Sequence, residues 1–89
     1  MELLLKVENS FEIAGRGLAL TPDLGLRPWA KDVTQEVVIE LPDGSSTTSF
    51  ARVAIEHFRP TGYRIVVYLP ALRREEVPIG SKVFWRPER

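Results

Sequence analysis

Residues 36–58, EVVIELPDGSSTTSFARVAIEHF, decide the fold class because they read as a β-hairpin. Apolar side chains alternate with other residues over 36–41 and again over about 47–58, which is the period of a half-buried strand. Between these runs, Pro42 stands at the first central position of a turn and Gly44 two places later, a pattern typical of hairpin turns. The stretch therefore predicts two adjacent antiparallel strands.

The same alternation recurs on both sides of this hairpin, and no window of a dozen residues shows a helical stripe. Turn signals at Gly15-Arg16-Gly17 and Pro60-Thr61-Gly62 separate the runs. An open edge in so short a sheet would leave backbone groups unpaired beside apolar strands, and closure removes that hazard. We therefore expect an all-β fold, and within that class a small closed six-stranded antiparallel β-barrel.

The 89 residues form a single domain, 1–89, because a chain of this length has no apolar surface to spare for a second core. We expect the longest loop over residues 22–33, which contain two prolines and a glycine and lack a steady alternation. The charged tail, 86–89, follows the last expected strand and is expected to fray.

The charge of the chain is balanced overall but not along its length. Twelve basic and twelve acidic residues give a formal net charge of zero, which argues against a strongly electrostatic nucleic-acid binder. Residues 1–50 nevertheless have four basic and eight acidic residues, whereas residues 51–89 have eight and four. This asymmetry either forms a basic face for an acidic partner or lets the two halves of one barrel attract each other.

The absence of cysteine excludes disulfides and thiolate metal sites, so the apolar core must hold the fold, with or without an oligomeric partner. A reducing cytoplasm is the compartment that fits best. At the start of the chain, Glu2 stands where an export signal would have basic residues, and the apolar run stops after three leucines. We expect no export signal, no membrane span and a cytoplasmic location.

Catalytic and metal-binding patterns are weak. His57 is the sole histidine, and the hydroxyl residues 45–49 follow a hairpin turn, where small polar residues are expected for structural reasons. One histidine with scattered carboxylates lacks the spacing of a triad or of a metal site. Glu75 and Glu76 lie beside Arg73 and Arg74 and read as a self-neutralising turn. We expect no enzyme activity, no metal and no cofactor.

Two segments resemble a known family. Residues 7–17, VENSFEIAGRG, and residues 73–83, RREEVPIGSKV, resemble the opening and closing segments of the second domain of elongation factor Tu and related translation GTPases, a small closed β-barrel. Looser similarity in residues 53–59 and 62–69 extends the likeness over most of residues 3–85. Residues 26–32 depart from the family pattern, being longer and aromatic.

The nucleotide domain that precedes this barrel in the translation factors has no counterpart here. No Gly-x-x-x-x-Gly-Lys-Ser/Thr loop occurs, so GTP hydrolysis is excluded for this chain by itself.

Glu56 is the sharpest candidate that the resemblance supplies. The matching glutamate of elongation factor Tu lies in the pocket that receives the terminal adenosine of aminoacyl-tRNA. The resemblance therefore implies a non-catalytic module that binds RNA, such as a tRNA end, or a translation-related partner. In this hypothesis phosphates are bound by Arg52, Arg59, Arg64 and Arg73. The competing interpretation is that Glu56 pairs with an arginine of the adjacent strand on a solvated face.

A protein-interaction or oligomerisation function is the alternative. Trp29, beside Arg27 in a proline-stiffened loop, is either an interface anchor or a plug for one mouth of the barrel. Phe84 and Trp85 alternate on the last expected strand, so one of them points away from the core. An exposed aromatic there indicates a homo-oligomer.

Overall fold

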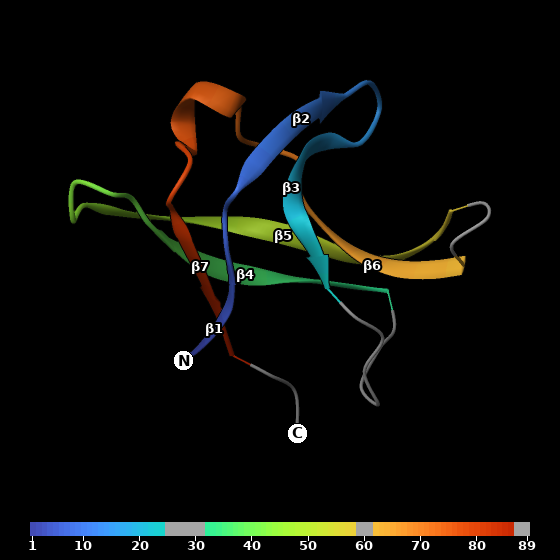
Figure 1. The fold of residues 1–89 in the computed structure, drawn as a ribbon. Helices are drawn as coiled ribbons and strands as arrows, with labels where there is room; N and C mark the ends of the chain where they lie inside the picture. The colour runs from blue at the N-terminus through green and yellow to red at the C-terminus, as the bar shows by residue number, and fades with distance from the viewer. Residues whose placement is uncertain (25–31, 59–61, 87–89) are drawn as a thin grey trace.

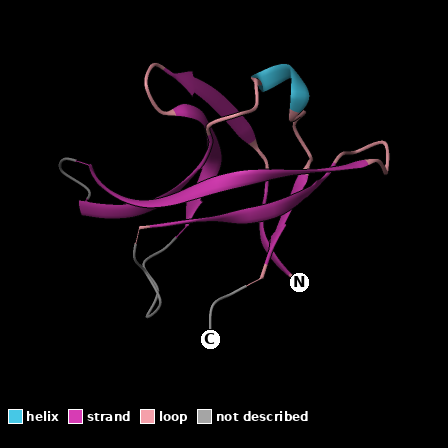
Figure 2. Ribbon diagram, turned by 180° about the vertical axis from the view of Figure 1, so that it is seen from behind, coloured by secondary structure: helices cyan, strands magenta, loops and turns pink. Residues whose placement is uncertain are grey.

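The computed structural model describes residues 1–24, 32–58 and 62–86, and the predicted all-β fold is confirmed there (Figure 1). A single short 3-10 turn, Arg74–Glu76, interrupts the strands of the described ranges (Figure 2). No helix in those ranges has the length and apolar character needed to cross a bilayer. The strands are β1 (Glu2–Lys6), β2 (Asn9–Ile13), β3 (Gly17–Leu24), β4 (Val33–Glu40), β5 (Ser46–Phe58), β6 (Gly62–Leu69) and β7 (Lys82–Trp85).

All pairings are antiparallel and form one curved sheet in the order β1-β7-β4-β5-β6-β3-β2. The expectation of six strands was wrong because the residues before the turn at Gly15-Arg16-Gly17 form two strands: β1 pairs with β7, and β2 pairs with β3. At the division, the Val7 N–H donates to the Ser81 carbonyl (2.7 Å) and the Glu8 N–H to the Thr21 carbonyl (2.8 Å). The chain thus changes its pairing partner within two residues.

β1 and β2 are therefore the two end strands of the sheet, although they are consecutive in the chain. Among the described residues no ladder joins these two strands to each other, so the observed sheet is not closed into the expected barrel.

The strand boundaries shorten the expected loop over residues 22–33. β3 continues through Pro22 to Leu24, and β4 begins at Val33. The pairing of β3 with β6 is irregular between Leu20 and Leu24, which accommodates a proline that has no N–H for the ladder.

The predicted turn between β4 and β5 is confirmed. The Leu41 N–H donates to the Ser45 carbonyl (2.8 Å) and the Gly44 N–H to the Leu41 carbonyl (2.9 Å). The Ser45 hydroxyl and backbone N–H both donate to Asp43 Oδ1, at 2.6 and 2.9 Å. These hydrogen bonds, that of the hydroxyl first, hold the pKa of Asp43 below its usual value.

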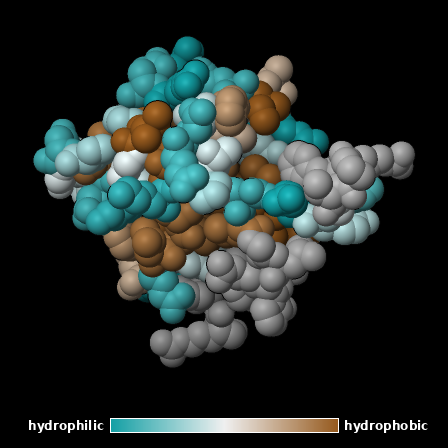
Figure 3. Space-filling model, viewed as in Figure 1, coloured by the Kyte–Doolittle hydropathy of each residue, from teal (hydrophilic) through white to brown (hydrophobic). Residues whose placement is uncertain are grey.

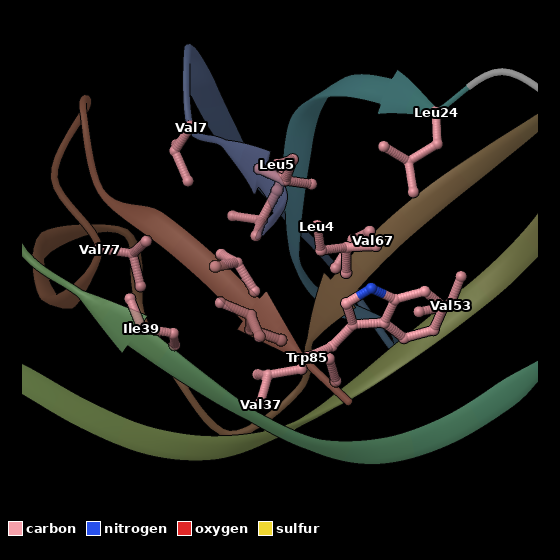
Figure 4. Close-up of a cluster of buried hydrophobic side chains, with 14 of the residues drawn as sticks. Leu4, Leu5, Val7, Leu24, Val37, Ile39, Val53, Val67, Val77 and Trp85 are labelled. Atoms are coloured by element: carbon pink, nitrogen blue, oxygen red, sulfur yellow. The ribbon is translucent and has the colours of Figure 1, made fainter. Parts of the chain in front are cut away.

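One face of every strand except β2 contributes to the core. On the inward side of β5, Ala51 and Val53 are fully buried and Ile55 packs against the same cluster. Trp85 points into this cluster among aliphatic side chains that include Leu4, Val53 and Val67 (Figure 4). The alternation of buried and exposed residues along β4 and β7 follows from this one-sided burial.

β6 is buried on both faces over its longest run, from Ile65 to Leu69. Ile65, Val67 and Leu69 face the core. On the opposite face, Val66 and Tyr68 form a second small cluster with Ala19 of β3 and Ala54 of β5. This outer cluster forms the floor of the site described next.

Candidate functional site

A groove of about 690 Å³ lies on the outer face of β3, β6 and β5, below the β2–β3 hairpin. Figure 1 shows this hairpin standing away from the β5–β6 ribbon. Apolar side chains form the floor and one wall, and charged side chains form the rim. The apolar group is Phe11, Ile13, Ala19, Leu20, Val66 and Tyr68, and the polar group is Arg16, Thr21, Asp23, Glu56 and Arg64.

The strand registers explain why these residues meet. Ala19 of β3 is level with Tyr68 of β6, and Tyr68 is level with Arg52 of β5. Four residues further along each strand, Arg64 is level with Glu56. Residues two apart on a strand share a face. On the outer face, the apolar side chain of Val66 therefore lies next to the charged pair Glu56 and Arg64.

Arg16 reaches the groove from the turn between β2 and β3. Gly17 has φ of +94°, and a Cβ atom there would lie 2.5 Å from Pro70 Cα. A glycine is therefore required for the close approach of the hairpin to the chain after β6. This approach places the Arg16 side chain over the outer face of β5 and β6.

Glu56, Tyr68 and Arg16 form a hydrogen-bonded group at the rim. The Tyr68 hydroxyl donates to Glu56 Oε2 at 2.9 Å, and Arg16 Nη1 donates to the same carboxylate oxygen and forms an ion pair with it. Arg16 Nη1 also donates to the Tyr68 hydroxyl oxygen at 3.3 Å. The Glu56 side chain is 20% exposed, so its carboxylate is half-sheltered beside the apolar floor.

The group is electrostatically consistent. The hydrogen bond to Tyr68 and the charge of Glu56 raise the pKa of Arg16 further, so this guanidinium stays charged. Burial is the main cause that raises the pKa of Tyr68 above its usual value, with the hydrogen bond to Glu56 acting in the same direction and Arg16 against it. Tyr68 is therefore held as a neutral hydrogen-bond donor.

This raised pKa makes a prediction about stability. The folded protein holds the Tyr68 proton more tightly than the unfolded chain does. The contribution of this proton to the free energy of unfolding is therefore fully present below the unfolded pKa of about 10, and it is lost as the pH rises through the folded pKa. At neutral pH we expect Tyr68→Phe to lower the free energy of unfolding by about 1 kcal/mol, because the variant lacks the hydrogen bond to Glu56. Above pH 10 the difference in free energy of unfolding between wild type and Tyr68→Phe should become smaller.

Urea unfolding followed by circular dichroism between pH 8 and 11 measures the effect. Tyr63→Phe is the control because the Tyr63 ring is 60% exposed and lies outside the groove, so this variant should follow the wild-type curve. A gap between wild type and Tyr68→Phe that stays constant across this range contradicts the role given to Tyr68.

Two further arginines flank the group. Arg64 Nη1 donates to Asp23 Oδ2 at 2.9 Å, although Arg64 is level with Glu56 in the ladder. The guanidinium carbons of Arg52 and Arg16 lie 6.0 and 5.9 Å from the centre of the Tyr68 ring. Arg52 Nη2 lies 3.6 Å from Asp32 Oδ2. The aromatic ring thus has two half-exposed cations beside it.

The structure brings together three of the five residues predicted to bind RNA. Glu56 and Arg64 line the groove, and Arg52 borders it. Arg73 lies elsewhere, in a separate hollow of about 370 Å³ beside the β2–β3 turn. Arg59 lies outside the described residues. Glu56 does pair with an arginine, but with Arg16 from the hairpin turn rather than with an arginine of the adjacent strand.

The residues predicted for protein interaction lie outside this groove or outside the described residues. Trp85 is 6% exposed and belongs to the core, which removes its side chain from the outer surface of this chain. Phe84, its neighbour, is half-buried on the opposite face of β7. Arg27 and Trp29 lie outside the described residues.

Sequence reasoning missed Arg16 and Tyr68 as site residues. The motif Gly15-Arg16-Gly17 is typical of a turn, and this backbone pattern predicts no role for its central side chain. A stronger signal was present in β6, where the outward positions Val66 and Tyr68 are apolar although an outer face should be polar. That excess of apolar residues marks a covered outer surface.

Two hydroxyl groups line the groove beside its charged side chains. Its hydroxyls are Tyr68 and Thr21, and the Thr21 hydroxyl donates to the Asn9 carbonyl at 3.1 Å. His57 lies away from the groove, with its ring centre 4.8 Å from that of Tyr63. In the described ranges no three histidine, cysteine or acidic side chains gather as metal ligands.

Comparisons with known proteins add no identification. No family model, no curated protein and no solved structure matches this chain.

Proposed function

We propose that this chain is a non-catalytic binding module, resembling the barrel domain of elongation factor Tu, whose groove receives the 3′-terminal nucleoside of an RNA such as tRNA. The supporting observation is the place of Glu56: its carboxylate stands at the rim of a groove of about 690 Å³ with an apolar floor. An aromatic base has two apolar faces and a polar edge, and this arrangement of floor and rim suits both.

The arginines suit the rest of such a ligand. Arg16, Arg52 and Arg64 have half-exposed side chains on the rim, within reach of a backbone that leaves the groove. Each guanidinium has a carboxylate neighbour, which keeps the groove close to neutral in the free protein. Binding a phosphate would exchange one of these exposed ion pairs, which are individually weak, for a contact with the ligand.

We also propose that the sheet closes as a barrel in this function, as the resemblance implies. The stretch from β1 to β2 is continuous in the chain and is bonded to β7 at one end and to β3 at the other. Such a stretch can serve as the closing strand between the two ends of the sheet. A closed wall would give the groove a rigid floor, and a cytoplasmic location would give it access to RNA.

A titration with fluorescently labelled single-stranded RNA ending in 3′-adenosine tests the proposal. We expect Glu56→Gln to weaken binding by roughly tenfold or more, because hydrogen bonds from the ligand to a charged acceptor are lost. Arg64→Ala should weaken binding and reduce its salt dependence, since fewer counterions are released. Arg74→Ala is the matched control because Arg74 bonds to Asn9 outside the groove.

The outcomes are distinct. Binding that weakens with salt and is lost in the Arg64 and Glu56 variants but kept in the Arg74 variant supports the proposal. No binding at concentrations of tens of micromolar removes it.

A second function, as a protein-interaction or oligomerisation domain, is favoured by a different observation. Leu3 is 52% exposed and is level with the half-buried Phe84 on the outer face of β1 and β7. Figure 3 shows apolar surface gathering over the part of the molecule where β1 and β7 lie. This surface is separate from the groove, so the two functions are compatible.

A further inference from the structure

The outer face of β7 and β4 bears two columns of opposite charge at matching heights. On β7 and just after it, Lys82, Phe84 and Arg86 point outward, as the alternation with buried Val83 and Trp85 requires. On β4, the outward residues are Glu40, Val38 and Glu36. The register places Lys82 level with Glu40 and Phe84 level with Val38, and its continuation places Arg86 beside Glu36.

Exposed apolar side chains gather around these columns. Seven large hydrophobic residues of the described ranges are strongly exposed, and two of them, Phe11 and Ile13, line the groove. Three others lie on this face: Leu3 beside Phe84, Phe50 beside Glu36, and Met1, which continues the β1 register toward Arg86. Apolar surface that gathers on one face indicates an interaction site.

We infer that this face, which we call the β7–β4 face, docks a second copy of the chain around a two-fold axis that runs parallel to the strands midway between β7 and β4. The inference rests on the oligomerisation function proposed above and not on the groove. A rotation about this axis keeps the height of every residue and exchanges the two columns. It therefore places Lys82 opposite the partner's Glu40, Arg86 opposite the partner's Glu36, and Phe84 opposite the partner's Val38.

The same rotation matches the flanking apolar residues. Met1, just before β1, and Phe50 of β5 lie at the same height on the two outer strands of this four-stranded face. Met1 therefore meets the partner's Phe50, and Phe50 meets the partner's Met1. Both are about two-thirds exposed, at 65% and 60%. A self-complementary patch of this kind is what an isologous interface requires.

Charge is what selects a second copy over an unrelated partner. A face whose columns were both basic or both acidic would repel its own copy, because like charges placed opposite each other across an interface are strongly unfavourable. Here the basic and acidic columns are neighbours. The described residues form no ion pair between Lys82 and Glu40 within one chain, so both remain available to the partner.

Sedimentation equilibrium with charge-reversed variants tests the inference. The wild type should show a mass that rises with concentration toward that of a dimer. Lys82→Glu alone and Glu40→Lys alone should each lower the association constant by about tenfold or more, because each variant places like charges opposite one another twice. An equimolar mixture of the two variants should associate again, since each copy then meets an opposite charge.

Three controls accompany this experiment. Circular dichroism confirms that each variant is folded, and the double variant Lys82→Glu with Glu40→Lys should self-associate like wild type. Glu56→Gln, which alters only the groove, should sediment as wild type, so failure of the dimer and failure of RNA binding are separate results. A wild type that stays monomeric at all concentrations, or a mixture that does not regain association, overturns the inference.

Discussion

Replacing Gly17 with alanine will lower the free energy of unfolding by about 2–4 kcal/mol. Two costs add. A non-glycine residue at a φ of +94° pays the left-handed penalty, and the new methyl group would lie 2.5 Å from Pro70 Cα, a backbone atom that cannot turn aside. Either the β2–β3 hairpin or the chain after β6 must move, and with it the turn that presents Arg16 to Glu56.

Gly15→Ala is the matched control for this prediction. Gly15 belongs to the same turn and has φ of +79°, but no atom lies within 4 Å of its Cβ position. Gly15→Ala should therefore lower the free energy of unfolding by only about 1–2 kcal/mol, which is the backbone penalty alone. Urea unfolding followed by circular dichroism measures both variants. Equal losses would mean that the close approach of Gly17 to Pro70 does not hold the hairpin in place.

Trp85→Ala will have a still larger effect, a loss of about 3–5 kcal/mol. The indole is 6% exposed within the main core, and its removal leaves a large cavity between β1, β4 and β7 (Figure 4). Domains of this size have total stabilities of about 5–15 kcal/mol, so the variant should be marginally folded or unfolded. Thermal and urea unfolding measure the loss.

Phe84→Ala provides the comparison within the same strand. Phe84 is half-buried on the outer face, so its truncation in a monomeric sample should cost about 1 kcal/mol, much less than that of Trp85. If the order of the two losses is reversed, Phe84 and not Trp85 faces the core, and the assignment of the β7–β4 face fails with it.

The sequence predicts the fold class well because alternation of burial is a local property. The hairpin of residues 36–58 follows from period two, and its turn at Asp43 follows from turn chemistry. The sequence does not predict the division of the first strand. That division arises because residues 7 and 8 bond to Ser81 and Thr21, which are distant in the chain.

The candidate site shows the same limit. Glu56 was predicted from a resemblance, whereas its actual partners, Arg16 and Tyr68, are 40 and 12 residues away in sequence and meet it only through the sheet order. The loop expected over residues 22–33 was too long, because a strand can include a proline where its ladder is irregular. Alternation could say that one of Phe84 and Trp85 faces inward, but not which one.

The proposed function requires the outer face of β3, β6 and β5 to be a binding surface. Two-dimensional ¹H–¹⁵N correlation spectra of the labelled protein, recorded while a short RNA ending in 3′-adenosine is added, test it most directly. We expect the largest shifts in the amide signals of four residues in the floor and rim of the groove, Ala19, Thr21, Ala54 and Val66, while the signals of Val38 and Phe84 stay in place. Spectra that do not change, or shifts confined to β7 and β4, would contradict it.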